Sequence, residues 1–289
     1  MEELDIIQDG MDGVILLNKP EGITSFDAVN RCRRILHEKK TGHNGTLDPN
    51  ASGLMIVLLG KYTKFLPYCI SNHKRYHATF QFGSMTDTGD IWGNVINKKT
   101  PDNHTVEELQ QVAESFLGQG TQIPPMYSAL KVNGKKLYEL ARQGKTIERE
   151  ARPIVIDSIQ VTMEEGQWHL YAEVSSGTYI RTLINDLGEV VGELAVMSSL
   201  VRTGIESVSL EDAVTLEELE AHPRFATIND VIDPCYPMIE TKQYEDVIHG
   251  RTVRLDSEVP VVLFQKDGVI LAAYERREHG MYHCKRGLL

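Results

Sequence analysis

The segment GHNGTLDPNASGLMIVLL, residues 42–59, joins a turn-rich stretch directly to an unbroken apolar run. Its glycines allow backbone angles that larger residues resist, and Pro49 fixes the chain just after Asp48. The apolar run from residue 53 predicts a buried strand. An Asp-Pro pair is also typical of an ordinary surface turn. The density of turn formers nevertheless indicates a rigid loop that positions one carboxylate, that of Asp48.

Outward from this segment, strands and helices mix without a regular alternation. Strands are predicted over 13–20, 53–60, 76–83 and 167–176, and helices over 24–39, 105–118 and 179–192. The expected N-caps are Thr24 or Ser25 for the first helix and a Thr105–Glu108 capping box for the second. The expected apolar faces are Phe26, Val29, Cys32 and Ile35 in the first helix, and Ile180, Leu183, Ile184 and Leu187 in the third. The order favours an α+β fold over a doubly wound one.

Two further segments differ from the rest of the chain. Residues 124–152 are rich in bases and interrupted by prolines and glycines, which predicts an excursion that closes over a ligand or merely decorates the core. Residues 259–275 form two apolar runs about Asp267-Gly268, which predicts a β-hairpin. We therefore expect one domain over 1–235 and a small β-rich module over 236–289.

Composition limits the class of protein. The chain has 289 residues, of which 41% are hydrophobic, enough for a sizeable core. No stretch approaches the roughly 20 apolar residues of a membrane span, and the acidic N-terminus lacks the layout of a signal peptide. The four cysteines are scattered without a CxxC pair, which favours reduced thiols in the cytoplasm over a zinc site.

The net charge is −11, which argues against a non-specific nucleic-acid binder. Bases nevertheless concentrate in HKRYH (73–77), KVNGKK (131–136) and ARQGK (141–145). Any one such cluster is typical of a solvated face. Together they leave a local site for an anionic ligand open.

Several kinds of chemistry fit the sequence poorly. The histidines show neither HxH nor HExxH spacing, and no acidic cluster has EF-hand form, so no metal is expected. Glu139 stands where a phosphate-binding loop ending in Gly144-Lys145-Thr146 needs its first glycine, and no GxSxG elbow is present. What remains is acid chemistry by Asp48, because carboxylates form covalent intermediates with sugars. The candidates for its neighbours after folding are Tyr76, Tyr179, Arg181 and Asp90.

Six stretches, in order along the chain, resemble the TruB family of tRNA pseudouridine synthases. They are LNKPEGITS (17–25), GHNGTLDPNASGLMIVLLGKYTK (42–64), KRYHATFQFGSMTDTGDIWGNV (74–95), QIPPMYSALKVNGKKLYELARQG (122–144), SSGTYIRTLINDLGE (175–189) and AVMSSLVRTGI (195–205). A lone Asp-Pro turn is weak support, whereas six collinear motifs are specific. The third motif resembles the family pattern T-D-T-x-D-x-x-G.

The resemblance implies the pseudouridine synthase fold, a mixed and largely antiparallel central sheet flanked by helices, with a C-terminal module similar to a PUA barrel. It implies isomerisation of uridine to pseudouridine at position 55 in the T loop of tRNA, without cofactor or metal. Asp48 is then the essential acid, which either attacks C1′ or abstracts a sugar proton to give a glycal. The sequence does not choose between these routes.

Other roles are carried over by position. The catalytic partners of Asp48 are Tyr76, which stacks on the base and helps remove its C5 proton, and Arg181, which forms a salt bridge with Asp48. The substrate-binding set is His43 against the displaced nucleotide, Lys19 with Pro20 under the catalytic loop, and Tyr179, Leu200 and Asp90 at the pocket. Each has a structural alternative, such as core packing for Leu200 and a strand aromatic for Tyr76.

The implied partner is the T-arm of tRNA, whose uridine must be flipped out of a folded loop. Five cations of the insertion are expected to form an RNA clasp, namely Lys131, Lys135, Lys136, Arg142 and Lys145. No guide-RNA or obligatory protein partner is expected, and we interpret the chain as a stand-alone, monomeric enzyme of the bacterial type. The short C-terminal segment is the weaker match.

Two rival classes stay open. A glycoside hydrolase also directs a carboxylate at an anomeric carbon but typically needs a second one, for which Asp87 or Asp90 would serve. A non-catalytic chaperone that binds and refolds tRNA would need the clasp and Tyr76 but not Asp48.

Overall fold

The computed structural model describes residues 10–132 and 134–288. Residues 1–9, where the sequence predicts no export signal, lie outside this range. Contacts divide the chain into two compact units. The first unit comprises the chain up to Pro49, Gly53–Ser71 and the chain from Ser207 onward, and the second comprises Asn50–Ser52 and Asn72–Glu206.

The N-terminal part of the first unit is built around one buried strand. Its elements are β1 (Gly13–Lys19), α1 (Ser25–Ile35), β2 (Thr41–Asn44), β3 (Ser52–Leu59), η1 (Gly60–Tyr68), β13 (Val208–Ser209), η2 (Leu210–Asp212), α5 (Leu216–Ala221) and η3 (Ile228–Val231). Strand β3 pairs antiparallel with both β1 and β2. It is buried from Gly53 onward, which confirms the strand predicted from the apolar run.

Helix α1 confirms one prediction and corrects another. Thr24 is the N-cap, because its side chain accepts from Asp27 N while the Asp27 carboxylate accepts from Thr24 N. The helix ends at Ile35, short of the expected residue 39. Phe26 is 67% exposed, so its assignment to the apolar face was wrong. The buried stripe runs through Ser25, Ala28, Val29 and Cys32, the i, i+3, i+4, i+7 pattern of one helix face.

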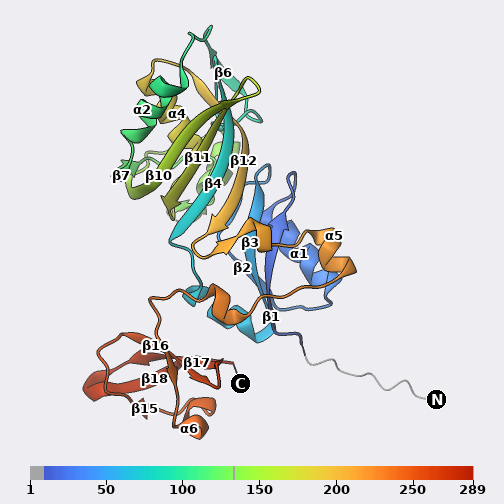
Figure 1. Cartoon of the computed structure of the whole chain (residues 1–289), viewed down its shortest axis with the longest axis vertical. Coiled ribbons are helices and arrows are strands. Elements are labelled where there is room, and N and C mark those ends of the chain that lie inside the picture. The colour runs from blue at the N-terminus through green and yellow to red at the C-terminus, as the bar shows by residue number, and fades with distance from the viewer. Residues whose placement is uncertain (1–9, 133, 289) are drawn as a thin grey trace, which may run out of the picture. The chain divides into compact units, whose positions relative to one another are not determined.

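The second unit is a five-stranded antiparallel sheet in the order β12-β4-β11-β10-β7. Its strands are β4 (His73–Phe82), β7 (Gly118–Gln122), β10 (Arg152–Glu164), β11 (Gln167–Ser175) and β12 (Ala195–Ile205). Helix α2 (Val106–Glu114) packs on β10 and helix α4 (Ile180–Val190) on β12, and the two helices contact each other (Figure 1).

These two helices cover one face of the sheet. Along β4, Ala78 and Phe80 are buried, but Thr79 between them is buried as well, so the strand does not alternate strictly between buried and exposed side chains. The four apolar residues predicted for α4 are all buried. In α2, Thr105 accepts from Glu108 N, but the Glu108 carboxylate contacts His104 Nδ1 at 3.1 Å. The capping box is therefore only half formed, and the helix ends at Glu114 rather than at Gly118.

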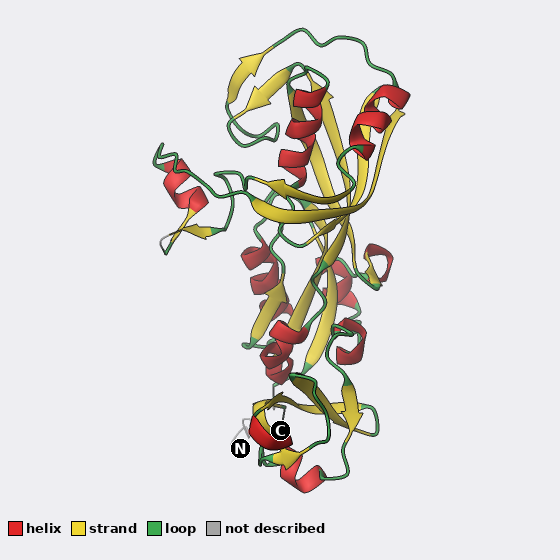
Figure 2. Ribbon diagram, turned by 90° about the vertical axis from the view of Figure 1, so that its left-hand side faces the viewer, coloured by secondary structure: helices red, strands yellow, loops and turns green. Residues whose placement is uncertain are grey.

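Short elements connect these larger ones. The strands β5 (Ser84–Thr86) and β6 (Val95–Lys98) form one hairpin, β8 (Lys131–Val132) and β9 (Lys135–Lys136) form another, and α3 (Leu137–Arg142) follows it. Figure 2 shows the helices in red and the strands in yellow. The segment predicted as an excursion, residues 124–152, thus contains a small hairpin and one short helix.

The C-terminal part of the first unit is β-rich, as predicted. Its elements are β14 (Met238–Glu240), α6 (Tyr244–Ile248), β15 (Val253–Arg254), β16 (Val261–Lys266), β17 (Val269–Arg276), η4 (Glu278–Gly280) and β18 (Met281–Gly287), with strand order β14-β16-β17-β18-β15. The predicted hairpin is formed by β16 and β17. Its turn residues have φ values of 50° at Asp267 and 78° at Gly268, as a tight hairpin turn requires.

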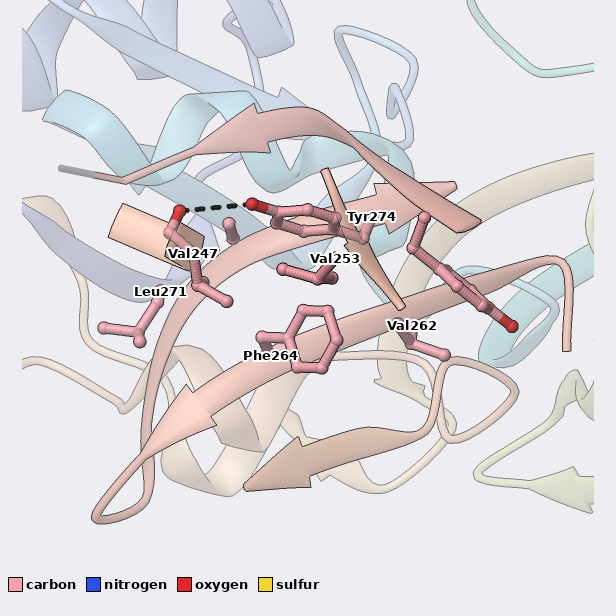
Figure 3. Close-up of a cluster of buried hydrophobic side chains, with 8 residues drawn as sticks. Val247, Val253, Val262, Phe264, Leu271 and Tyr274 are labelled. Carbon is pink, nitrogen blue, oxygen red and sulfur yellow. Dashed lines mark hydrogen bonds between the residues drawn. The ribbon is translucent and has the colours of Figure 1, made fainter. Parts of the chain in front are cut away.

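A compact apolar cluster holds these C-terminal strands together (Figure 3). Its labelled members are Val247, Val253, Val262, Phe264, Leu271 and Tyr274. The phenol of Tyr274 is fully buried, yet its hydroxyl donates to Val247 O and Arg251 O at 3.3 and 3.0 Å. Buried polar groups need such partners. Burial raises the pKa of this phenol to about 12.

The architecture is therefore α+β, with a largely antiparallel sheet flanked by helices and a β-rich C-terminal part, which confirms the predicted fold class. The predicted division of the chain into 1–235 and 236–289 stays a prediction. Within the described residues, no helix is long and apolar enough to cross a membrane.

Candidate active site

The loop that carries Asp48 connects β2 to β3 and is fixed on the side that precedes the acid. Ser25 Oγ, at the start of α1, accepts from Leu47 N at 2.9 Å and lies 3.1 Å from Leu47 O. Ser25 and Leu47 are both buried, with exposed fractions of 2% and 3%. Because these contacts are shielded from water, the residue before Asp48 has little freedom.

The residue that follows the acid is held by Lys19. This lysine is fully buried at the end of β1. Its Nζ donates to the carbonyls of Pro20, Ile23 and Pro49 at 2.9, 2.7 and 3.1 Å. A second donor, Gly22 N, reaches Pro49 O at 3.0 Å. A buried ammonium is tolerated only when such acceptors replace its water. Lys19 thus joins the end of β1 to the loop that carries Asp48, and the predicted role of Lys19 and Pro20 in catalysis stays a prediction.

His43 is not in the loop itself, which corrects the expectation from sequence. It lies in β2, half-buried and paired with Val57 of β3. Asp48 is also half-buried, so its side chain keeps access to solvent. Lys19, His43 and Asp48 form the part of the candidate site that belongs to the first unit.

In the second unit, Tyr76 and Leu200 occupy the helix-covered face of the sheet. Tyr76 of β4 pairs with Arg202 of β12, and Leu200 pairs with Ala78. Because side chains two residues apart share a face, Tyr76 and Leu200 point to the same side. Leu200 is 8% exposed whereas Tyr76 is half-buried. Tyr76 is therefore partly exposed on a face of the sheet where Ala78 and Leu200 are buried.

Lys74 lies on the same face, two residues before Tyr76. It is nearly buried, and its Nζ donates to Ser176 Oγ at 3.1 Å. Burial and, to a smaller extent, the positive charge of Arg202 lower the pKa of Lys74 to about 8, against the opposing effect of Glu206. In the sequence, Lys74 stands out only as one member of the basic cluster HKRYH (73–77).

Arg181 is the most constrained of the predicted catalytic residues. It follows the first residue of α4 and is 3% exposed. Nη1 donates to Thr88 O at 2.6 Å, Nη2 donates to Tyr127 O at 2.8 Å, and Nε lies 4.0 Å from Asp90 Oδ2. A planar guanidinium has several N–H donors at fixed angles, so it can contact acceptors on different residues at the same time. The structure thus brings together Arg181 and Asp90, while the predicted salt bridge of Arg181 to Asp48 stays a prediction.

Tyr179 is the N-cap residue of α4, and its backbone is clamped by an amide that the sequence analysis missed. Gln122 Oε1 accepts from Tyr179 N at 2.8 Å, and Gln122 Nε2 donates to Tyr179 O at 3.1 Å. Gln122 is 4% exposed. In the sequence, Gln122 is marked only by its place directly before Ile-Pro-Pro in one of the six motifs. The contact of Gln122 with the start of α4 is visible only in the fold.

The five predicted clasp cations lie on the small hairpin, on α3 and just beyond α3. Lys131 is directly opposite Lys136 across the hairpin. Lys136 Nζ and Arg142 Cζ lie 5.4 and 5.3 Å from the centre of the Tyr138 ring. All are exposed except Lys136, which is half-buried. The ring thus orders two cations while the others remain available to an anion.

Among the residues that the structure describes, no cluster of three or more histidine, cysteine, aspartate or glutamate side chains is arranged to hold a metal ion. The functional groups present are instead a carboxylate on a fixed loop in the first unit and a partly exposed phenol and a buried guanidinium in the second. Such groups can orient a sugar, stack on a base and stabilise negative charge.

Family models match most of the chain. The model of the N-terminal domain of TruB family pseudouridylate synthases matches residues 33–180. The model of the tRNA pseudouridylate synthase B C-terminal domain matches residues 181–236. The chain therefore belongs to the TruB family of pseudouridylate synthases.

Relatives named tRNA pseudouridine synthase B match nearly the whole length. That of Lacticaseibacillus paracasei is 40% identical over 290 residues, which cover 94% of this chain and 96% of the relative. That of Oenococcus oeni is 42% identical, covering 96% of this chain and 98% of the relative. That of Geobacillus thermodenitrificans is 39% identical and covers 93% of each chain.

Among solved structures, a chain of the Cbf5-Nop10-Gar1 complex is similar with a TM-score of 0.69 and 23% identity. The similarity covers 98% of this chain and 86% of that one. A chain of the archaeal box H/ACA sRNP Nop10-Cbf5 complex gives a TM-score of 0.66 at 20% identity, over 98% and 87% of the two chains. At this level of identity the likeness establishes the fold alone.

Proposed function

We propose that this protein isomerises uridine to pseudouridine in tRNA, at position 55 of the T loop, with Asp48 as the essential acid. The observation that carries the proposal is that the backbone is fixed on both sides of Asp48. Leu47 before it and Pro49 after it are both held by buried side chains, Ser25 and Lys19. Fixing one acid in this way removes much of the entropy cost of aiming it at a substrate.

The reaction conserves the atoms of the nucleotide. The bond between C1′ and N1 breaks, the uracil turns over, and a bond forms between C1′ and C5. The proton leaves C5 and N1 gains one, so no oxidant or co-reactant is needed. In one route the Asp48 carboxylate attacks C1′, and in the other it abstracts a sugar proton to give a glycal. Both routes need an ionised carboxylate, which a nearby Arg181 would favour.

Tyr76 supports this chemistry by its position. A partly exposed phenol on this face of the sheet offers a stacking surface for the flipped uracil. Its hydroxyl is the group that we assign to removal of the C5 proton. We assign Tyr179, Leu200, His43 and Asp90 to binding and orienting the nucleotide, and Lys19 to the loop beneath it.

The substrate is a polyanion, whereas the chain has a net charge of −11. We propose that the clasp cations Lys131, Lys135, Lys136, Arg142 and Lys145 contact phosphates of the T-arm. The Tyr138 ring between two of them supports an ordered basic surface. We further propose that the enzyme acts in the cytoplasm as a monomer without guide RNA, with residues 1–235 catalytic and 236–289 a PUA-like RNA-binding module.

The deciding experiment measures tritium release from a tRNA transcript labelled at C5 of uridine. We expect stoichiometric release by the wild type and none by Asp48→Asn, which preserves the shape of the side chain. Asp256→Asn, at an exposed aspartate outside the candidate site, is the matched control and should release tritium normally. Release by Asp48→Asn at the wild-type rate would overturn the assignment of Asp48.

Two further readouts address substrate position and the rival classes. Mapping of pseudouridine along the product should find it at position 55, and modification elsewhere would refute the finer proposal. Free uracil in the mixture would indicate a glycoside hydrolase. Binding and refolding of tRNA without any tritium release by the wild type would indicate a chaperone.

A further inference from the structure

The loop between β5 and β6 exposes an aromatic ring that none of the assigned roles uses. Trp92 is 42% exposed, and its neighbour Ile91 is 44% exposed. On the following strand, Ile96 is 61% exposed. Large apolar side chains that are exposed close together along the chain favour a contact surface. The question is which kind of partner this loop contacts.

The loop is held in one conformation by its own hydrogen bonds. Trp92 N donates to Asp90 Oδ1 at 3.2 Å, and Ile91 N donates to Met197 O at 2.9 Å. Asn94 donates to the Asp87 carboxylate through its backbone and its side chain, at 2.8 and 3.0 Å. The ring is therefore presented from an ordered backbone, which reduces the entropy cost of binding a ligand.

Gly93 shows how tightly this turn is packed. A Cβ atom added at that position would collide with Thr88 Oγ1 and Asp87 Oδ1. The glycine directly after Trp92 is thus required for the turn to close. This packing fixes the position of the backbone next to the tryptophan.

The same loop also holds Arg181. Thr88 O accepts from Arg181 Nη1 at 2.6 Å, and Asp90 Oδ2 lies 4.0 Å from Arg181 Nε. Trp92 is only two residues beyond Asp90, a reach of at most about 7 Å along the chain. The exposed ring is therefore carried by the segment that holds Arg181, a predicted catalytic residue.

The charges of the β5–β6 loop favour contact with RNA through stacking and not through ion pairs with phosphates. Its two carboxylates are already engaged, Asp87 with Asn94 and Asp90 with Thr88 Oγ1 at 2.7 Å. An indole ring binds the face of an unpaired base by stacking, which needs no basic residue and tolerates any base. This mode suits an acidic protein whose substrate is a folded RNA loop with a displaced nucleotide.

We propose that Trp92 stacks on an unpaired base of the RNA substrate. This contact helps to hold the RNA loop that contains the flipped uridine. The proposal rests on the proposed function for the nature of the substrate. The resemblance to the family motif leaves this position open, so the ring is a substrate contact of this chain's own residues. Trp92 binds and positions RNA in this proposal and takes no part in bond making.

The first test is spectroscopic and needs no change at Trp92. The chain has two tryptophans, and Trp168→Phe leaves Trp92 as the only indole. Trp168 packs near Phe80 and Phe82 at ring distances of 6.2 and 6.1 Å, so phenylalanine is a conservative replacement. Titration with an unmodified T-arm stem-loop, in an Asp48→Asn background to prevent turnover, should quench Trp92 fluorescence. Unchanged fluorescence at saturating RNA would overturn the proposal.

The second test measures Kd for the same RNA in the same background. Trp92→Ala should raise Kd about tenfold, as removal of one stacking ring does, and Trp92→Phe should retain most of the affinity. Ile96→Ala, on the same hairpin, is the matched control and should not change Kd. An unchanged Kd for Trp92→Ala, or equal weakening by both alanine variants, would assign the surface to another class of partner and refute stacking.

The failure of this inference is separable from failure of the proposed function. Tritium release by the wild type together with flat Trp92 fluorescence would retain the isomerase and remove the stacking contact. Quenching and a raised Kd without tritium release would retain the contact and remove the isomerase.

Discussion

Lys19 Nζ donates to the carbonyl of Pro49 at 3.1 Å, one residue beyond Asp48. The lysine is fully buried, and its other two acceptors, Pro20 O and Ile23 O, lie in the turn that precedes α1. The ammonium therefore ties the end of β1, this turn and the acid-bearing loop together. We therefore predict that Lys19 acts by fixing the backbone of this loop.

Lys19→Met should consequently impair catalysis more than binding. Each of the three carbonyls loses the lysine as a donor, and Pro49 O keeps only Gly22 N. A shift of about 1 Å in the acid can cost roughly 100-fold in rate. Single-turnover tritium release should slow by about 10- to 100-fold while Kd for tRNA changes little. Lys39→Met, at an exposed lysine, is the control. A wild-type rate for Lys19→Met would show that the loop keeps its geometry without the ammonium.

Arg181→Lys tests whether the guanidinium is needed for its shape. The substitution keeps the charge but cannot reach Thr88 O and Tyr127 O together, which lie 2.6 and 2.8 Å from different nitrogens. We expect the rate constant of the chemical step to fall at least about tenfold, because the retained charge is displaced, and a misplacement of about 1 Å can cost roughly 100-fold in rate.

The control for this prediction is Arg224→Lys. Arg224 also donates to two carbonyls, those of Asp212 and Ala213, but it is exposed and belongs to the first unit. Its replacement should leave the single-turnover rate unchanged. Equal rates for the two lysine variants would contradict a geometric role for the Arg181 fork.

The clasp makes a prediction about salt. Replacing Lys131, Lys135 and Lys145 by alanine should weaken tRNA binding and flatten the plot of log Kd against log salt, by about 0.7–0.9 for each phosphate that is no longer neutralised. The control replaces three exposed cations in and just after α1 by alanine, namely Arg33, Arg34 and Lys39. It changes the net charge by the same amount as the clasp variant. If both triple variants changed the slope equally, the effect would reflect overall charge and not a clasp.

Lys74 makes a prediction about stability and pH. Its pKa is lowered to about 8 in the folded chain, from 10.5, chiefly by burial. Below pH 8 the folded state must keep a buried charge, which costs about 3 kcal/mol. Between these two pH values the unfolded chain binds more protons than the folded one, so wild-type stability rises with pH.

Lys74→Met removes this titration. The variant should be more stable than wild type at neutral pH, and its advantage should shrink as the pH rises from 8 to 10.5. Chemical denaturation at several pH values measures the difference, with Lys98→Met, at an exposed lysine, as the control. A constant difference between Lys74→Met and wild type across this range would show that Lys74 does not titrate abnormally.

How far the sequence could predict this molecule depended on how local each signal was. The apolar run of β3, the Thr24 cap and the Asp267-Gly268 turn are set by neighbouring residues, and all were predicted. Strand β7 was not predicted. Its sequence, GQGTQ, is neither apolar nor alternating, and it is a strand only because β10 pairs with it. Pairing between distant segments leaves no local trace.

The candidate site shows the same limit. Motifs located Asp48, Tyr76 and Arg181, because their residue types and order resemble a family. They gave no indication that Ser25 fixes Leu47 or that Gln122 clamps Tyr179, contacts between residues 22 and 57 positions apart. The misplacement of Phe26 had another cause, because a spacing of three cannot distinguish one helix face from its neighbour over a few turns.

The C-terminal module yields the last prediction. Tyr282 is fully buried, and its hydroxyl donates to Val259 O at 2.7 Å and Ser257 O at 3.2 Å. Tyr282→Phe keeps the ring but leaves both carbonyls without this donor, which should cost about 1–2 kcal/mol of unfolding free energy. Tyr282→Ala also creates a cavity and should cost about 3–5 kcal/mol.

Tyr244→Phe, at an exposed ring (39%), is the control. Hydrogen exchange of the β17 and β18 amides reports on this module separately from the rest of the chain. Equal protection in Tyr282→Phe and wild type would mean that water replaces the hydroxyl, and that the ring alone holds these strands together.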